Sequence, residues 1–192
     1  MLDIIQDTLK SIQPVSPIRL KGAQAHLDSL TKPPGSLGLL EDLAKKYAAI
    51  RDTHHPSINK KSVIIFAADH GVTEEGISAY PAEVTPQMVQ NFLDGGAAIN
   101  VLARQQNAEV LVVDIGVNHR FAPHPDLLDR KIAFGTRNMA KEPAMTRTQA
   151  EESITIGIQM AAELADKGVD LLATGEMGIG NTTASSAIFS VL

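Results

Sequence analysis

Three apolar runs in this sequence end abruptly in polar residues, at Val63–Ala68, Glu109–Ile115 and Val169–Ala173. Uninterrupted runs of this length are typical of strands that are buried on both faces of a parallel sheet. Helical patterns separate the runs, which favours the strand, helix, strand order of a doubly wound fold. The sequence therefore predicts an α/β protein with a mainly parallel, Rossmann-like sheet.

Weaker signals complete this outline. A further short strand is expected at Ile132–Gly135. Glycine after a helical pattern favours a C-terminal cap, and threonine followed by proline favours a helix start. The predicted helices begin at Thr85-Pro86, cover Ala97–Arg104, and run from about residue 148 to 167, where Gly168 ends the last one.

The sequence pattern predicts a helical segment with few strand signals over residues 1–57 and the α/β core over residues 58–192. Pro33-Pro34-Gly35 fixes a loop within the first segment, and Ser36 is expected to cap a helix over Leu37–Ile50. The apolar run near Leu192 stops without a helix cap. Since few strands are visible, the core is expected to be incomplete at its C-terminal side.

The composition excludes several classes of protein. Of the 192 residues, 44% are hydrophobic and 20% charged, as in ordinary globular domains. The formal net charge is -5 with no basic run, so neither nucleic acid nor an anionic membrane surface is an expected partner. Cysteine is absent, which rules out disulfides and thiolate metal sites. No signal peptide or membrane span is visible, so a cytoplasmic location is expected.

Thr174–Thr183 carries the strongest functional pattern, a strand end followed by glycines and a helix start. Gly178 and Gly180 let a ligand approach the bare backbone. Asn181 and Thr182 can cap a helix whose free N–H groups point outward, and such groups suit a phosphate or ribose phosphate.

Glu176 is unusual in this motif because a carboxylate repels an anion. Its position suggests a role toward a developing positive charge or a ribose hydroxyl. Two interpretations stay open for the motif taken alone: a nucleotide-binding loop, or an ordinary strand-to-helix turn. The spacing matches neither the dinucleotide fingerprint nor the phosphate loop that ends in Gly-Lys-Ser/Thr.

A second group of residues could bind a flat ring. Ser78, Tyr80, Gln87 and Met88 combine an aromatic ring and a thioether for the faces of a ring with polar groups for its edges. The alternative is that Met88 and Phe92 belong to a plain core stripe.

Carboxylate and histidine pairs follow two of the strands, Asp69 with His70 and Asp114 with His119. Asp69 and His70 could form an acid-base pair or half of a metal site, but neighbouring residues on a strand point to opposite sides, so direct catalysis is the less favoured alternative. Asp114 and His119 lack a third ligand at a convincing spacing. Structural or supporting roles are therefore favoured, and no metal or other cofactor is expected.

Four motifs together resemble one family. They are Leu30–Gly38 (LTKPPGSLG), Ala67–Val72 (AADHGV), Val84–Phe92 (VTPQMVQNF) and Thr174–Thr183 (TGEMGIGNTT). In this order they are similar to nicotinate-nucleotide:dimethylbenzimidazole phosphoribosyltransferases, which make the lower-ligand nucleotide of cobalamin. The resemblance implies a glycosyltransferase, a homodimer without metal, and a small helical domain built partly from residues 1–57.

The resemblance also assigns roles to residues. Ser78, Tyr80, Gln87 and Met88 would line the benzimidazole pocket. The residues against nicotinate mononucleotide would be Glu176, Met177, Gly178, Asn181 and Thr182, beside Gly180.

The family's general base lies in a C-terminal portion that this sequence lacks. The chain alone is therefore expected to be nearly inactive. Two rivals are a fragment that only binds the benzimidazole or the nucleotide, and another nucleotide-binding α/β protein.

Overall fold

The computed structural model describes residues 2–192. It divides into two compact units, one formed by Asp7–Ile58 and the other by Asn59–Leu192 together with the first residues up to Gln6. Helix α1 (Leu2–Ser11) spans the boundary between the two. The division after Ile58 lies one residue from the expected one, whereas the start of the chain groups with the α/β unit.

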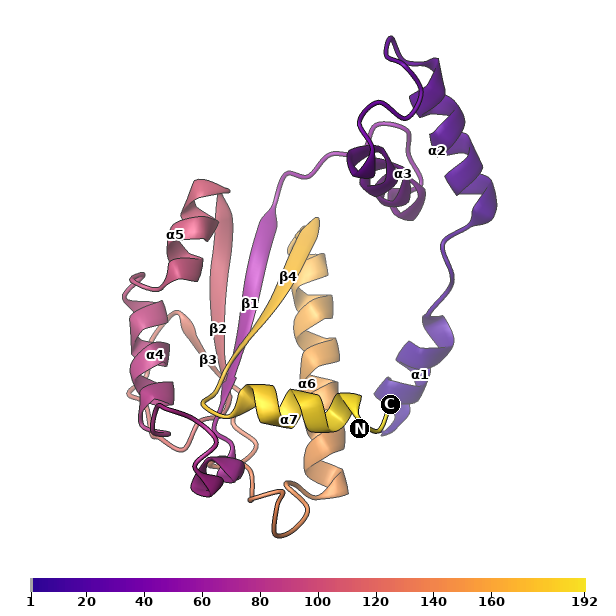
Figure 1. Cartoon of the computed structure of the whole chain (residues 1–192). Helices are drawn as coiled ribbons and strands as arrows, with labels where there is room; N and C mark the ends of the chain where they lie inside the picture. Colours follow the sequence, from indigo (N-terminus) through magenta and orange to yellow (C-terminus); the bar gives the residue numbers. More distant parts are fainter. Residues whose placement is uncertain (1) are drawn as a thin grey trace. The chain divides into compact units, whose positions relative to one another are not determined.

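The α/β unit contains a sheet of four strands in the order β3-β2-β1-β4, and each neighbouring pair is parallel. The prediction of a doubly wound α/β sheet is thus confirmed (Figure 1). Its elements are β1 (Lys61–Ala68), the 3-10 helix η1 (Gly71–Glu75), α4 (Val84–Leu93), α5 (Ala98–Gln105), β2 (Ala108–Gly116), β3 (Leu127–Asp129), α6 (Arg147–Asp166), β4 (Leu171–Met177) and α7 (Asn181–Phe189).

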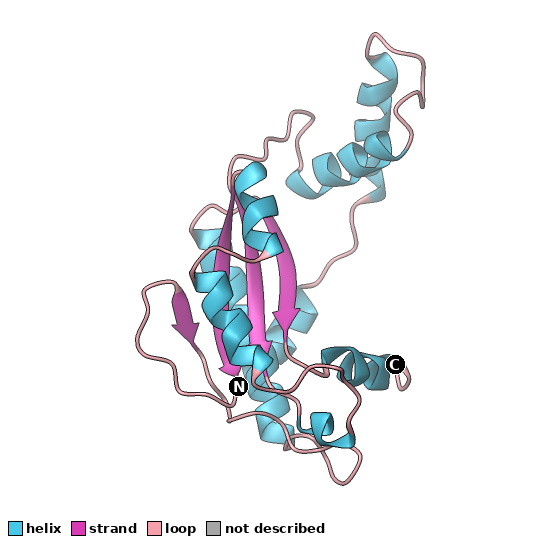
Figure 2. Cartoon of the chain, turned by 60° about the vertical axis from the view of Figure 1, so that its left-hand side comes forward, coloured by secondary structure: helices cyan, strands magenta, loops and turns pink. Residues whose placement is uncertain are grey.

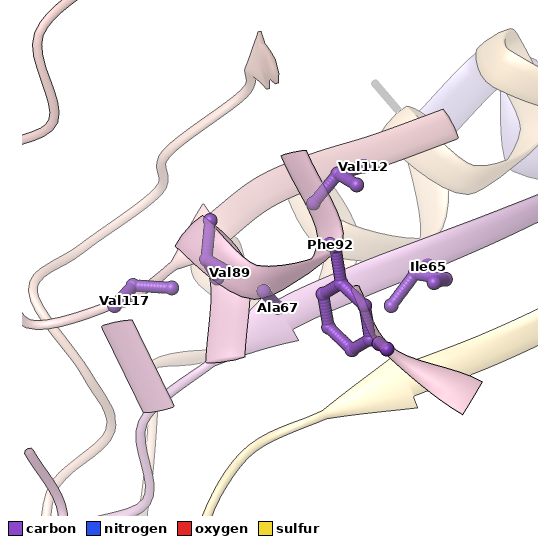
Figure 3. Close-up of a cluster of buried hydrophobic side chains, with 7 residues drawn as sticks. Ile65, Ala67, Val89, Phe92, Val112 and Val117 are labelled. Carbon is purple, nitrogen blue, oxygen red and sulfur yellow. The ribbon is translucent and has the colours of Figure 1, made fainter. Parts of the chain in front are cut away.

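Apolar clusters cover both faces of the sheet, because alternate residues of each strand point to opposite sides. Ile65 and Val112 pack with Val89 and Phe92 of α4 on one face (Figure 3). Ile64 packs on the other face against α6, in a cluster that includes Ile156, Met160 and Leu164. In Figure 2, helices of this unit lie on both sides of the strands. Burial on both faces explains why the strands appear in the sequence as continuous apolar runs.

The prediction of a strand at Ile132–Gly135 is wrong, because the structure has no strand there. The segment lies beside the end of β2 and is attached to it by isolated hydrogen bonds. Ile132 N–H donates to Ile115 O, and Gly135 N–H donates to Gly116 O. Gly135 has φ +78°, which breaks an extended conformation. The strand beside β2 is instead the shorter β3, which pairs with Val112–Asp114.

The strand order creates a switch point between β1 and β4. From β1 the chain passes through α4 and α5 to β2, and it returns through α6 to β4 on the other side of β1. In open α/β sheets, ligands bind at the carboxyl ends of the two strands on either side of such a switch point. Asp69-His70 follows the end of β1 at this point, and Gly178–Gly180 follows the end of β4.

The helical unit packs α2 (Pro17–Ser29) against α3 (Leu39–Arg51). Ser16 is the N-cap of α2, but the expected Ser36 cap of the next helix is wrong, because Gly38 occupies that position with φ +54°. Buried Glu41 instead accepts from Lys32 Nζ at 2.8 Å and from Leu37 N–H at 3.0 Å, which fixes the proline loop.

No helix in the part of the chain that the structure describes combines the length and apolar character that a membrane span requires.

Candidate functional site

The glycine motif starts inside β4 rather than after it. Thr174–Met177 pair with Ile64–Ala67 of β1, so the strand runs four residues past its expected end at Ala173. The loop itself is short, Gly178–Gly180, and it lies directly at the switch point between β1 and β4.

Gly178 is packed against the end of β1. A Cβ at this position would overlap the carbonyl oxygen of Ala68 and lie 3.0 Å from ring atoms of His70. No other residue type fits such a close approach of two backbones without a shift of one of them. The need for glycine here is therefore a packing requirement.

Gly180 fixes the other end of the loop. It is the N-cap residue of α7 and has φ +88°, a conformation that favours glycine. A Cβ there would lie 3.1 Å from Cγ2 of Thr73 and 3.3 Å from Cδ1 of Ile77. The segment that follows β1 thus packs against the glycine loop.

Thr85 holds the middle of the loop. The predicted helix start at Thr85-Pro86 is one residue late, because α4 begins at Val84 with Glu83 as its N-cap residue, and Thr85 lies within the first turn. Its side chain is fully buried, and its Oγ1 accepts a hydrogen bond from Ile179 N–H at 3.1 Å. Local sequence patterns could not indicate this contact, which joins residues 94 positions apart.

The expected outward-pointing N–H groups at the start of α7 are used inside the protein. Asn181 N–H donates to Gly178 O at 3.0 Å and Thr183 N–H donates to Gly180 O at 3.1 Å. Asn181 also folds its side chain back, so that its Oδ1 accepts from Thr182 N–H at 2.7 Å. A phosphate at this helix start would have to replace some of these internal bonds.

Glu176 projects from β4 toward the face of the sheet that α6 covers. It pairs with Phe66, which packs on that face, and residues paired across neighbouring strands point to the same side. The side chain is exposed, and its Oε1 accepts a short hydrogen bond from Asn181 Nδ2. Met177 points the opposite way and packs against the Val89 and Phe92 cluster.

Asp69 and His70 connect β1 to the loop region. Asp69 is buried, and its Oδ2 accepts from Asn118 N–H at 2.7 Å while its backbone O accepts from Thr136 N–H at 3.0 Å. Burial lowers the pKa of His70, and the carboxylates of Glu176 and Asp69 oppose this effect. A neutral imidazole beside Gly178 follows for neutral pH.

The residues expected to bind a flat ring do not form a closed pocket in this chain. Tyr80 is 67% exposed and Gln87 is also exposed, whereas Met88 packs against the α4 side of the core together with Met177. Ser78 is half-buried and its Oγ accepts from Tyr80 N–H at 3.2 Å. The core alternative for Met88 is therefore supported.

A cavity of about 420 Å³ is lined by a different set of residues. It occupies the ends of β1 and β2 next to the start of α6, where Asp69, Thr136 and Gln149 contribute to its wall. None of the residues assigned to the benzimidazole or to nicotinate mononucleotide lines it.

Asp114 has a structural role. Its Oδ2 lies 2.6 Å from Lys131 Nζ, and its Oδ1 accepts from Val117 N–H at 2.9 Å. His119 instead packs its ring against Phe121 at 4.8 Å between centroids. These contacts shape the turn that follows β2.

The fold and the position of the loop define a class, namely an α/β protein with a glycine loop at the switch point of a parallel sheet, where proteins of this class bind their ligands. Comparison with known proteins makes this class specific. The model of a family described as "Phosphoribosyltransferase" matches residues 12–192. The chain belongs to this phosphoribosyltransferase family, and the resemblance found in the sequence motifs is confirmed.

Relatives with assigned names agree. The nicotinate-nucleotide–dimethylbenzimidazole phosphoribosyltransferase of Geobacter sp. (strain M21) is 55% identical over 189 residues, which are 98% of this chain and 54% of the relative. The protein of the same name from Chloroflexus aurantiacus (strain ATCC 29366 / DSM 635 / J-10-fl) is 52% identical over 191 residues, which are 100% of this chain after rounding and 54% of the relative.

A solved structure is also similar. The nicotinate-nucleotide–dimethylbenzimidazole phosphoribosyltransferase from Thermus thermophilus aligns with a TM-score of 0.88 at 46% identity, over 92% of this chain and 53% of that one. The chain thus spans about half the length of the relatives it matches.

Proposed function

We propose that this chain provides part of the active site for phosphoribosyl transfer from nicotinate mononucleotide to 5,6-dimethylbenzimidazole. The products are nicotinate and α-ribazole 5′-phosphate, the nucleotide of the lower ligand of cobalamin. The observation that carries the proposal is the glycine loop, which lies at the switch point with Glu176 beside it. The names of the relatives supply the substrates.

The reaction suits a carboxylate at this position. The bond between ribose C1′ and the pyridinium nitrogen breaks, and nicotinate leaves with the electron pair as a neutral pyridine ring. Positive charge then develops on the ribose, and Glu176 would stabilise it or hold a ribose hydroxyl. A ring nitrogen of the benzimidazole attacks C1′ from the opposite face, and a base removes the proton from the other ring nitrogen.

The chain alone is expected to bind substrates with little or no turnover. The family resemblance places the base outside this sequence. In the described part of the chain, Glu176 and Tyr80 are exposed, and an exposed carboxylate is less effective because water screens its charge. A cytoplasmic location and a homodimer that binds no nucleic acid belong to the same proposal.

Calorimetry on the purified 192-residue chain, next to an assay of nicotinate release, tests these statements. Nicotinate mononucleotide should bind, and release should be absent or nearly so. Full turnover by the chain alone would refute the expected lack of a base. A chain that binds neither the nucleotide nor the benzimidazole would refute the proposed function.

Glu176→Gln separates the two roles of the carboxylate. Glutamine keeps an acceptor for a hydroxyl and for Asn181 but removes the charge. If charge matters, affinity for the pyridinium nucleotide should fall about threefold to tenfold, a loss of roughly 1 kcal/mol. Affinity for ribose 5-phosphate, which lacks the positive ring, is the control and should not fall. If the original chain and Glu176→Gln bind the nucleotide with equal affinity, the charge of Glu176 has no role in substrate binding.

A further inference from the structure

We propose that Thr85 is a positioning residue, whose buried hydroxyl sets the glycine loop in the conformation that binds the nucleotide. The inference rests on the proposed function and adds to it a residue on α4 that does not need to touch the substrate. It makes nucleotide affinity depend on a contact between two motifs that lie far apart in the sequence.

The loop has a particular need for a partner at Ile179. Gly178 packs against the backbone of β1, and Gly180 packs against Thr73 and Ile77. Ile179 lies between these two contacts, and its N–H points to Thr85 Oγ1 at 3.1 Å. Two glycines permit many backbone conformations, so this hydrogen bond selects one of them.

The surroundings make the hydroxyl hard to replace. Thr85 is fully buried and Ile179 is half-buried, so water cannot easily take the place of a lost acceptor. A buried N–H without a partner is unfavourable, and the loop would rotate to find one. Such a rotation would move Gly178 and Asn181, and with Asn181 the carboxylate of Glu176 that it contacts.

The position of Thr85 also connects the two halves of the proposed site. Gln87 and Met88 follow it on the same helix and were expected to contact the flat ring. A single side chain thus joins the start of α4 to the glycine loop.

Two variants and a matched control test the inference in the 192-residue chain. Thr85→Val keeps the branched shape and removes the acceptor, and Thr85→Ser restores the hydroxyl. Thr155→Val is the control, because Thr155 is also a buried threonine in a helix, and its Oγ1 donates to Glu151 O at 2.8 Å far from the loop in sequence.

The first measurement is amide hydrogen exchange at Ile179 by NMR. Exchange should become about tenfold faster in Thr85→Val and stay near the original rate in Thr85→Ser and Thr155→Val. The second measurement is calorimetry with nicotinate mononucleotide. Affinity should fall about tenfold in Thr85→Val, equivalent to about 1.4 kcal/mol, and recover to within about threefold in Thr85→Ser.

Unchanged exchange at Ile179 in Thr85→Val would overturn the inference. Equal losses of affinity in Thr85→Val and Thr155→Val would overturn it too, because both would then report a general loss of stability. If the unmodified chain binds no nucleotide, the proposed function fails, and the affinity part of the inference fails with it. The exchange rates still decide whether Thr85 holds the loop.

Discussion

The two halves of the proposed site differ in how firmly the protein holds them. The glycine loop, Gly178–Gly180, is fixed by the end of β1, by the segment after it, and by Thr85 of α4. The residues expected to receive the flat ring are more open. Tyr80 is 67% exposed, and Ser78 makes its hydrogen bond to Tyr80 N–H, two residues away.

This difference indicates which ligand the chain is prepared to bind. A preorganised loop loses little conformational entropy on binding, whereas an exposed aromatic side chain must be ordered by its ligand. The backbone of the glycine loop should therefore need less ordering on binding than the heterocycle half, although a phosphate at the start of α7 still has to replace internal hydrogen bonds. The heterocycle half should gain its order on binding.

Gly178→Ala should have the largest effect, since it attacks the fixed half directly. The added Cβ would overlap the carbonyl oxygen of Ala68, so the loop or the end of β1 must move. We expect the free energy of unfolding to fall by about 2–3 kcal/mol, as in other overpacked sites. Nucleotide affinity should fall more than tenfold, and urea unfolding and calorimetry measure the two effects.

Gly157→Ala is the matched control for that substitution. Gly157 lies within α6, and an added Cβ there meets no atom within 4 Å. Alanine is the better helix former, so this variant should be slightly more stable, by up to about 1 kcal/mol. A Gly178→Ala protein with the original stability would show that the loop is not held against β1 in the way described.

The sheet could be predicted from the sequence because its signal is local. Apolar runs such as Val63–Ala68 fill strands that are buried on both faces, and Gly168, with φ +79°, ends α6 as expected. The short strand β3 was missed because three residues carry little pattern of their own. Its position depends on pairing with β2, which no local signal encodes.

The candidate site could be predicted only in part, for a similar physical reason. The glycines and Glu176 are apparent as a motif, since their types restrict the backbone and the charge at one place in the sequence. The contact from Ile179 to Thr85 is a property of the tertiary fold, and a threonine before proline has the same local pattern as a helix cap. From the sequence, Thr85 is therefore predicted to start a helix, and its hydrogen bond to the glycine loop is not apparent.

His70 should make the fixed half sensitive to acid. Burial lowers its pKa in the folded protein, so the unfolded chain binds more protons as the pH falls past the ordinary histidine value of about 6.5. The contribution to stability is complete above that pH, decreases on acidification, and levels off below the folded pKa. Urea unfolding between about pH 5 and 8 measures this trend.

The His70→Gln protein should lose less stability than the original protein over the same pH range, because glutamine does not titrate. His55→Gln removes an exposed histidine of the helical unit and serves as the control for loss of one imidazole. The same pH dependence in His70→Gln as in the original protein would assign the acid sensitivity to other groups.

Tyr80→Ala should have the smallest effect on the protein and the most selective effect on ligands. Because Tyr80 is 67% exposed, we expect the free energy of unfolding to change by no more than about 0.5 kcal/mol. Affinity for 5,6-dimethylbenzimidazole should fall about threefold to tenfold through loss of a ring contact, while nucleotide affinity stays the same.

Tyr80→Phe keeps the ring and should retain most of the benzimidazole affinity. If the two halves are independent, Tyr80→Ala should change the affinity for the benzimidazole and leave the affinity for the nucleotide unchanged. The contacts that fix Gly178, Ile179 and Gly180 come from β1, from the segment after it and from Thr85. A parallel loss of nucleotide affinity in Tyr80→Ala would show that the open half supports the fixed one. The loop would then depend on a residue whose side chain lies at the protein surface.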